Sequence, residues 1–157
     1  METLRELTVE DAAAYRALRL EMLARHPRAF GSSAEAERAR PLEAVAERIA
    51  TQHTLGGFIL GAFEGDALVG AAGLACNDRP KERHKAAVWG MYVAAAHRGR
   101  GLGRRLLEEA LARARRLPHV EQVALSVTVG NDAARALYES LGFEVYGTEP
   151  RALKVGG

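Results

Sequence analysis

The chain of 157 residues has few cysteines, no long apolar run and no signal-peptide pattern, and each absence excludes a class of protein. It has one cysteine, Cys76, which excludes a disulfide within the chain and any metal cluster built on several cysteines. No run approaches the roughly 18 uncharged apolar residues that a membrane-spanning helix needs. Residues 1–6 hold two glutamates where a secretory signal peptide has a basic start followed by an apolar stretch. We therefore expect a cytoplasmic protein with no membrane partner.

The chain also lacks a strong charge of either sign. Its 22 basic and 20 acidic side chains leave +2, far from the balance of a nucleic-acid-binding protein. Residues 97–117 are the exception, with seven arginines and two glutamates. This patch favours a small anionic ligand over a polyanion, with a solvated helix face as the alternative. Hydrophobic residues make up 48% of the chain, so we expect one folded domain over residues 1–157.

Helical spacing predicts two helices in the first third of the chain. Thr8 is a helix-capping residue, and Asp11, three positions later, completes a pattern close to a capping box. The apolar residues that follow recur at helical spacing up to His26-Pro27, where the run stops. Pro41 is a favourable first helical residue, and apolar side chains at 42, 45, 46 and 49 predict the second helix.

The rest of the chain changes period and predicts a sheet. Residues 58–63 and 67–76 have the pattern of a hairpin around the turn at 64–66, and residues 86–93 that of a third strand. The pattern then predicts a helix, a strand, a helix and two short strands, at 102–117, 123–127, 131–142, 143–146 and 153–155. We expect an α/β fold whose mixed sheet has antiparallel hairpins first and a right-handed β-α-β unit later.

A glycine-rich segment, Arg98-Gly99-Arg100-Gly101-Leu102-Gly103, joins the third of these strands to the long helix. Glycines let the backbone turn so that several N–H groups point at one place, and the following helix adds its positive end. Such a loop binds a phosphate or pyrophosphate. It is not a Walker loop, because Gly103 is followed by Arg104-Arg105, and it lacks the glycine that the dinucleotide fingerprint needs at position 104.

Arg98, Gly101 and Gly103 match a third pattern, Arg or Gln followed by two residues, Gly, one residue, and Gly or Ala. About thirty residues later comes an Asn-x-x-Ala-x-x-x-Tyr stretch and then Gly-Phe, formed by Asn131, Ala134, Tyr138, Gly142 and Phe143. On these motifs the chain resembles the GNAT superfamily of N-acetyltransferases over essentially its whole length. The stretch from His84 to Val93 looks like a bacterial subset whose substrates are commonly unassigned. The resemblance implies a mixed, mostly antiparallel sheet with about four helices on its faces, and with strands four and five parallel and splayed.

The resemblance also implies a cosubstrate site without a metal. Acetyl-CoA would lie where strands four and five splay, with its pantetheine arm along the backbone of Met91, Tyr92 and Val93. Its pyrophosphate would bind the loop residues Arg98, Gly99, Arg100, Gly101, Leu102, Gly103 and Arg104. Asn131 would contact the pantetheine region. Tyr138 would contact the cosubstrate and act as general acid toward the departing thiolate.

Some of these residues have simpler interpretations, which stay open. Asn131 is a natural helix cap, and Tyr138 lies on an apolar helix face where a core tyrosine would also lie. Arg104 and Arg105 are spaced to pair with Glu108 and Glu109, four residues further along the helix.

The expected activity is that of an acyl-CoA-dependent N-acyltransferase. It would transfer acetyl from acetyl-CoA to a primary amine, directly and in a ternary complex. The alternative is a non-catalytic sensor or subunit that binds CoA. The acceptor would be a small-molecule or peptide amine, held in part by Phe30, Gly31, Ser32 and Ser33.

Two departures from the family pattern shape further expectations. Ala87 stands where histone-type members have a glutamate base, so we expect a water held by backbone carbonyls, relayed through His84 or Glu82. The last strand is short for the family. Either a further segment follows it, or a neighbouring copy completes the edge in a homodimer.

Overall fold

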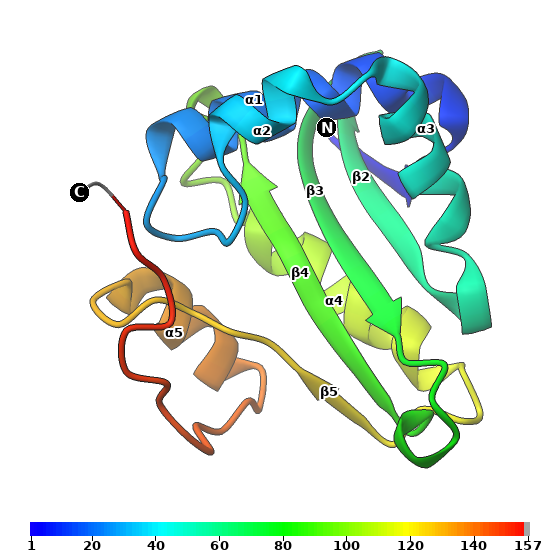
Figure 1. Cartoon of the computed structure of the whole chain (residues 1–157), viewed down its shortest axis with the longest axis vertical. Helices are drawn as coiled ribbons and strands as arrows, with labels where there is room; N and C mark the ends of the chain where they lie inside the picture. Colours follow the sequence, from blue (N-terminus) through cyan, green and yellow to red (C-terminus); the bar gives the residue numbers. More distant parts are fainter. Residues whose placement is uncertain (156–157) are drawn as a thin grey trace.

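In the computed structural model, which describes residues 1–155, a five-stranded sheet forms the centre of the molecule (Figure 1). Its strands follow one another in chain order: β1 (Thr3–Glu6), β2 (Phe58–Glu64), β3 (Ala67–Cys76), β4 (Lys85–Val93) and β5 (Gln122–Ala124). All neighbours are antiparallel except β4 and β5, which are parallel. The predicted α/β fold with a mixed, mostly antiparallel sheet is confirmed.

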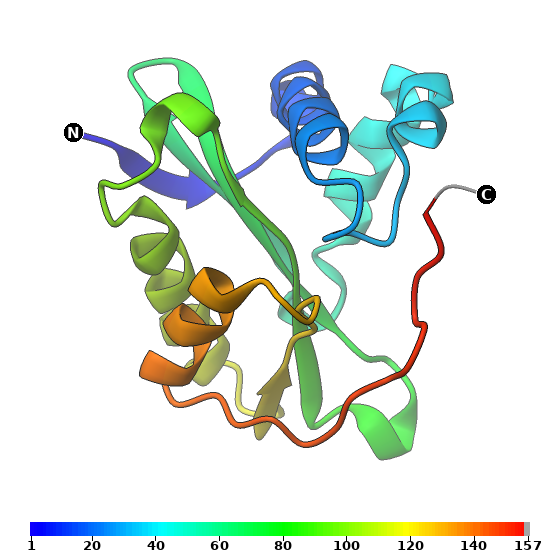
Figure 2. The same cartoon turned by 90° about the vertical axis from the view of Figure 1, so that its left-hand side faces the viewer.

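Helices cover both faces of the sheet (Figure 2). On one face lie α1 (Ala12–Arg25), α2 (Ala34–Ala39) and α3 (Leu42–Thr51), and on the other lie α4 (Leu102–Arg115) and α5 (Asp132–Ser140). Within residues 1–155 there are thus five α-helices where about four were expected. Short 3₁₀ turns add Val9–Asp11, Thr54–Gly56, Pro80–Glu82 and Ala95–His97.

The sheet separates two hydrophobic clusters. Leu60, Leu74 and Leu106 are fully buried between the sheet and α4, whereas Tyr15 and Ile59 are buried between the sheet and the helices α1 and α3. Because β2 and the middle of β3 are covered on both faces, their sequences are continuous apolar runs and do not alternate with polar residues.

The pairing of β4 with β5 is short, and it determines where a site can form. Only Lys85, Ala86 and Ala87 of β4 pair with β5, after which the chain turns away toward α5 (Figure 1). Beyond these three residues, β4 pairs with β3 on one side through Val88, Trp89, Tyr92 and Val93, and no strand among residues 1–155 pairs with residues 88–93 on the other side. The predicted splay of the fourth and fifth strands is confirmed.

A β-bulge in β4 accompanies this splay. Ala71 pairs with Tyr92 and Gly73 with Trp89, so β4 has one residue more than β3 between these pairs. Gly90 lies in the bulge with a φ of +59°, a backbone conformation that favours glycine.

Two predicted strands were wrong, and one helix was missed. The strands predicted at 143–146 and 153–155 are irregular backbone, and Val145, Tyr146, Leu153 and Val155 are exposed. Apolar residues become a strand only beside a partner strand, and β5, which ends at Ala124 instead of 127, offers a short edge. The helix α2 was not predicted; it begins after Ser33, whose hydroxyl accepts the N–H of Ala36 (3.1 Å).

The last two residues of the predicted 1–157 domain, Gly156 and Gly157, lie outside the described residues. The single domain and the homodimer stay predictions. Among residues 1–155, no helix has both the length and the apolar character needed to cross a membrane.

A buried ion pair joins α1 to α2. Arg19 Nε donates to Glu37 Oε1 (3.1 Å), and the Glu37 side chain is only 1% exposed. Arg19 lies four residues after Tyr15 on the face of α1 that points to the sheet, so the charge is held inside the cluster by its partner. The pair therefore sets the position of α2 and of the loop that precedes it.

Removing one member of this pair should destabilise the protein. Glu37→Ala leaves the Arg19 guanidinium buried without its partner, and we expect a loss of about 3–5 kcal/mol in the free energy of unfolding. Urea denaturation measures it. Glu35→Ala, at an exposed position of the same helix, should change the value by less than about 0.5 kcal/mol. Equal small losses in both variants would show that the pair does not stabilise the fold.

Candidate active site

The glycine loop forms an anion cradle at the start of α4. Gly99 and Gly101 have φ angles of +79° and +75°, so both positions favour glycine, and Gly101 is the N-cap of α4. The first helical hydrogen bond at this end runs from Arg105 N–H to the Gly101 carbonyl (3.1 Å). The N–H groups before it have no partner within the helix and point out of its positive end. A pyrophosphate is the kind of group that this geometry binds.

The structure brings the predicted residues of β4 to this cradle. A Cβ added at Gly103 would lie 3.3 Å from Met91 Cε and 3.7 Å from Val93 Cγ2, so the first turn of α4 packs closely on the end of β4. Leu102 is buried there and anchors the turn. The open edge of β4 therefore leads directly to the glycine loop.

Arg98 is held against the other face of β4. Its Nη2 lies 2.9 Å from His26 Nε2, its Nε donates to the Val93 carbonyl (3.2 Å), and its guanidinium lies 5.1 Å from the centre of the Tyr92 ring. Burial, the charge of Arg98 and the charge of Arg25 lower the pKa of His26. A neutral imidazole accepts a hydrogen bond from Arg98, so His26 fixes this arginine at the entrance of the loop.

The next arginine of the loop contacts the β2–β3 hairpin. Arg100 Nη1 lies 3.5 Å from Glu64 Oε2, and His97 Nε2 lies 2.8 Å from the same oxygen. The loop is thereby tied to a neighbouring hairpin through one carboxylate.

The arginines at the start of α4 divide between a predicted pairing and an unexpected one. Arg104 pairs with Glu108 (2.8 Å), as predicted, and also donates to Ser140 of α5 (2.9 Å). The predicted pairing of Arg105 with Glu109 is wrong, because Arg105 donates to the Glu2 carbonyl (3.0 Å). Glu109 pairs with Arg113 instead (2.9 Å).

Tyr138 and Asn131 lie on α5, beyond the splay. The predicted cap is confirmed, because the Asn131 side chain accepts the N–H of Ala134 (3.4 Å). Tyr138 is half-buried against the cluster on the α4 face, edge-on to Phe143 with ring centres 6.1 Å apart. Burial raises the pKa of Tyr138, so its hydroxyl is protonated at neutral pH and has a proton to donate.

The structure does not bring His84 and Glu82 to the glycine loop. They precede β4 at the end that pairs with β5, where the His84 carbonyl accepts the N–H groups of Glu121 and Gln122. Glu82 pairs with Arg79 (3.3 Å). His84 comes six residues before Gly90, about 20 Å along an extended strand. A relay through either residue stays a prediction that this separation does not favour.

The loop predicted to bind the acceptor lies on the α1 face of the sheet, and the chain just before it contacts the segment that follows β5. Phe30 packs against the cluster of α1 and α3, and Gly31 has open space around its Cα. Thr128, in the connection from β5 to α5, donates its hydroxyl to the Arg28 carbonyl (2.9 Å). The loop before Ser33 and the segment after β5 therefore meet through this hydrogen bond.

Residues 16–143 of the chain match the acetyltransferase (GNAT) family. The chain belongs to the GNAT acetyltransferase family. The family predicted from the glycine loop and the Asn131–Phe143 stretch is thereby confirmed.

Two relatives of this GNAT chain have assigned names. N-alpha-acetyltransferase RimI of Mycobacterium tuberculosis is 42% identical over 99 residues, which make up 62% of this chain and 59% of that protein. N-alpha-acetyltransferase 40 of Saccharomyces cerevisiae is 42% identical over 93 residues, which make up 54% of this chain and 33% of that protein. The matched stretch spans less than two thirds of either relative.

Solved structures agree with the fold of this GNAT chain. YncA of Salmonella typhimurium, solved with its cofactor acetyl-CoA, has a TM-score of 0.85 at 25% identity, covering 100% of this chain and 88% of its own. A ribosomal-protein-alanine N-acetyltransferase from Brucella melitensis has a TM-score of 0.79 at 28% identity, covering 92% and 86%. A GNAT acetyltransferase from Streptococcus pneumoniae, at 23% identity, shares the fold with a TM-score of 0.89, covering 99% and 92%.

Sequence reasoning missed one group of residues near the bulge of this GNAT chain. Arg19 of α1 and Arg48 of α3 approach Trp89, and Glu37 of α2 pairs with Arg19. A signal was present for Arg19, which lies at helical spacing from Tyr15 among apolar residues. No local pattern indicates Arg48 or Glu37, because their partners come from other elements.

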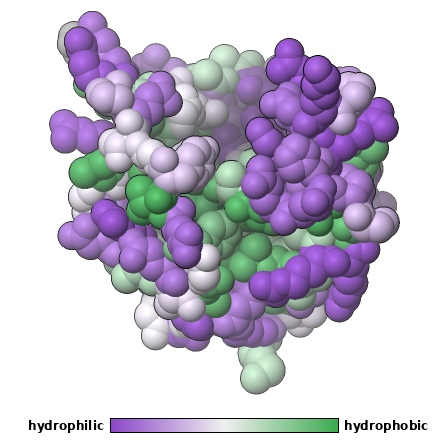
Figure 3. Space-filling view, turned by 90° about the horizontal axis from the view of Figure 1, so that it is seen from below, coloured by the Kyte–Doolittle hydropathy of each residue, from purple (hydrophilic) through white to green (hydrophobic). Residues whose placement is uncertain are grey.

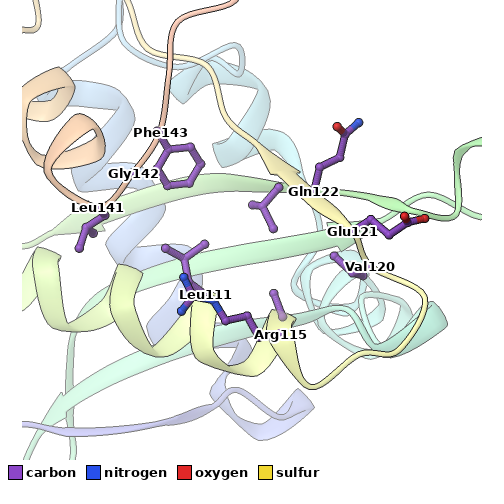
Figure 4. Close-up of a pocket in the computed structure, with 10 residues that line it drawn as sticks. Leu111, Arg115, Val120, Glu121, Gln122, Leu141, Gly142 and Phe143 are labelled. Atoms are coloured by element: carbon purple, nitrogen blue, oxygen red, sulfur yellow. The ribbon is translucent and has the colours of Figure 1, made fainter.

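Seen from below in the orientation of Figure 1, the surface of the GNAT domain is hollowed, with hydrophobic residues gathered between hydrophilic ones (Figure 3). A pocket of about 240 Å³ lies between the end of α4, β5 and the chain after α5 (Figure 4). It is lined by Leu111, Ala114, Arg115, Val120, Glu121, Gln122, Val123, Leu141, Gly142 and Phe143. None of the predicted site residues lines it, and it lies beside the paired end of β5, away from the glycine loop.

Titration of His26 tests its contact with Arg98. We expect an imidazole pKa below the ordinary 6.5, and Arg98→Met should raise it because the neighbouring positive charge is gone. Imidazole chemical shifts followed by NMR between pH 4 and 8 measure both values. Arg28→Met, a nearby exposed arginine outside this contact, is the control and should leave the titration unchanged.

The lowered pKa of His26 also makes the free energy of unfolding depend on pH. Because the pKa of folded His26 is lowered, the unfolded chain binds this proton more tightly. The His26 contribution to the free energy of unfolding is therefore present above about pH 6.5 and is lost as the pH falls through the folded pKa. An unchanged His26 pKa in Arg98→Met would mean that the two side chains do not interact in solution.

Proposed function

We propose that the protein is an N-acetyltransferase that moves acetyl from acetyl-CoA to the α-amine of an acceptor in the cytoplasm. The observation that carries the proposal is the open edge of β4, which runs from the bulge at Gly90 to the anion cradle at Gly99–Gly103. Family membership supports it, as do the names of the two relatives and the acetyl-CoA bound by YncA.

The chain offers acetyl-CoA two kinds of backbone contact. The unpaired edge of Met91–Val93 presents N–H and C=O groups of the type that an amide-containing pantetheine arm pairs with. The N–H groups at Gly101–Gly103 face the place of the pyrophosphate, and Arg98, Arg100 and Arg104 add positive charge around it. This length of strand thus aligns the arm, and the cradle fixes one end of it.

The chemistry near the bulge favours an α-amine over a lysine side chain. With a pKa of about 7.7–8.0, roughly one α-amine in seven is neutral at pH 7, which costs about 1 kcal/mol. For a lysine-like amine with a pKa of about 10.4 the cost is about 4.6 kcal/mol. Ala87 offers no carboxylate on β4, and His84 lies about 20 Å along the strand from Gly90. An acceptor that needs little help in losing its proton suits this site.

Direct transfer in a ternary complex is supported by the placement of Cys76. The thiol is half-buried at the end of β3, where Cys76 pairs with Ala86 near the closed end of the β4–β5 pair. Burial raises the pKa of the Cys76 thiol, which opposes formation of a nucleophilic thiolate. The acceptor amine itself therefore attacks the thioester.

The reaction then balances with groups at hand. The neutral amine forms a bond to the acetyl carbon, the C–S bond breaks, and the sulfur leaves with the electron pair. The nitrogen loses one proton to water, and the Tyr138 hydroxyl donates a proton to the sulfur and recovers one from solvent. A thiol pKa of about 8.5 makes the thiolate a tolerable leaving group, so the tyrosine assists a step that also proceeds without it.

Acetyl-CoA binding should depend on the glycine loop. Gly101→Val places a branched side chain at a positive φ, and Gly103→Val brings a side chain against Met91. Each variant should weaken acetyl-CoA binding by several kcal/mol, because the phosphate cradle is lost. Arg98→Ala removes one charge-assisted contact and should cost about 1–3 kcal/mol. Calorimetry measures these affinities, after circular dichroism has confirmed folding. Gly147→Val, on exposed chain with open space around it, is the control. Unchanged affinity in folded glycine variants would contradict the cradle.

Turnover with a panel of amines separates an enzyme from a CoA-binding sensor. We expect acetylation of N-terminal peptide amines by the wild-type chain. Binding of acetyl-CoA without turnover of any amine would favour the sensor.

Tyr138→Phe should lower kcat about tenfold to a hundredfold, toward the lower end of general acid catalysis because the leaving group is already good. The ring and its contact with Phe143 are kept, so acetyl-CoA affinity should stay the same. Single-turnover kinetics isolates the chemical step. Tyr146→Phe, at a side chain that is 91% exposed, is the matched control. Wild-type rates in Tyr138→Phe would make Tyr138 a core residue only.

A further inference from the structure

A cluster of arginines surrounds the single tryptophan on the α1 face of β4. The guanidinium carbon of Arg48 lies 5.2 Å from the centre of the Trp89 ring, and that of Arg19 lies 5.9 Å from it. Gly73 makes room for the indole, because a Cβ at position 73 would lie 2.3 Å from it. Trp89 is therefore seated on β3, with the two cations against it.

The charges in this cluster do not balance. Glu37 pairs with Arg19 (3.1 Å) and lies 4.0 Å from Arg40, so two guanidinium groups share this carboxylate and none of its ion pairs includes Arg48. The Arg48 guanidinium makes no ion pair or hydrogen bond with any residue in 1–155, and its Nη1 is buried. Burial and the charge of Arg19 lower the pKa of Arg48, the direction expected for a cation that lacks a partner.

A second buried donor lies beside it. The indole Nε1 of Trp89 is also buried, with no hydrogen-bond acceptor among the described residues. Buried N–H groups without acceptors are costly and uncommon in folded proteins. Two donors on contacting side chains, one of them charged, form half of a binding site for an anion with two acceptor oxygens.

The cluster borders the point proposed for acetyl transfer. Trp89 directly precedes the bulge residue Gly90, and a Cβ added at Gly90 would lie 3.4 Å from Arg19 Nη1. Both arginines approach from the face of the sheet on which Phe30, a residue predicted to hold the acceptor, packs. A group bound between Arg48 and Trp89 would therefore belong to the acceptor.

We propose that Arg48 and Trp89 bind a carboxylate of the acceptor, so that the substrate is an α-amine with a carboxylate close to the amine. This inference rests on the proposed function and narrows its substrate class. The carboxylate belongs to a free amino acid or to an acidic residue at the start of a peptide; the chemistry recognised is the same.

The positive cluster also has an effect on the amine. Nearby cations disfavour an ammonium group and so lower the pKa of an amine bound beside them. A polyamine would bring further positive charge to a place already rich in it, whereas a carboxylate offsets the excess. The same arginines thus select the acceptor and favour its reactive, neutral form without a carboxylate base on β4.

Paired acceptors test the proposal in steady-state kinetics. Alanine is compared with alaninamide, and the peptide Asp-Ala-Ala-amide with Asn-Ala-Ala-amide, on the wild type and on Arg48→Met. Methionine keeps the volume of the stem and removes the charge. We expect kcat/KM of the carboxylate acceptors to fall about 10- to 100-fold in Arg48→Met, mainly through KM, with less than about a threefold change for their amides. A carboxylate acceptor and its amide differ in the pKa of the amine. Because each acceptor is compared between the wild type and Arg48→Met, this difference cancels.

The control is Arg38→Met, which removes an exposed arginine of α2 and the same net charge. It should leave every acceptor unchanged. The arm that responds, free amino acid or acidic peptide, identifies the source of the carboxylate. Equal losses for carboxylates and amides in Arg48→Met, or no loss for either, would overturn the proposal.

Trp89 provides a readout that does not need turnover. Because it is the one tryptophan of the chain, its emission reports directly on its surroundings. We expect N-acetyl-alanine to change the emission saturably in the wild type, and N-acetyl-alaninamide to have no such effect. Arg48→Met should abolish the response.

This readout also separates the two proposals. If no amine is acetylated but the carboxylate response is present and depends on Arg48, the proposed function fails and the carboxylate site stands. The opposite result is that amines are acetylated, that no carboxylate compound changes the Trp89 emission, and that kcat/KM of the carboxylate acceptors is the same in the wild type and in Arg48→Met. The carboxylate site is then refuted and the activity stands.

Discussion

The three residue pairs that join β4 to β5 are the constraint on which the site depends. Each further pair would have used backbone groups of β4 between Val88 and Val93, with which no strand among residues 1–155 pairs on that side. The right-handed crossover through α4 brings β5 alongside β4 at one end, and the chain then leaves for α5. The sheet is thus continuous where it supports the core and open where a second molecule can add to it. Both proposed substrates are assigned to this opening, one along the edge and one across it.

The glycine loop was predictable from sequence because its cause is local. Gly99 and Gly101 have positive φ angles, and a strand, a tight turn and a helix follow one another within a dozen residues. The same holds for the cap at Asn131 and for the apolar runs of β2 and β3. The predicted strands at 143–146 and 153–155 failed because a strand depends on its neighbour, and sequence alone does not state which edge is free.

Contacts between elements that are distant in the chain were the other features that the sequence could not predict. The buried pair of Arg19 and Glu37 joins helices whose order in space follows from the packing of α1, α2 and α3. His84 and Glu82 were placed near the chemistry by their nearness in sequence to β4. The strand is long, however, and the two residues precede the end that β5 closes. Position along a nine-residue strand decides whether a side chain faces a substrate, and that position depends on where the partner strand stops.

The close contact between the Trp89 indole and Gly73 bears on how the choice of acceptor can vary in this fold. Residue 73 lies on β3, one strand in from the opening, and a methyl group there would collide with the Trp89 ring at 2.3 Å. In the proposed acceptor site, the position of the indole is therefore set by a backbone position on the neighbouring strand. Substituting Gly73 would displace the indole and leave the glycine loop, which follows the end of β4, untouched. For protein engineers, a single glycine inside the sheet would then be a control point for acceptor choice that a survey of surface residues would overlook.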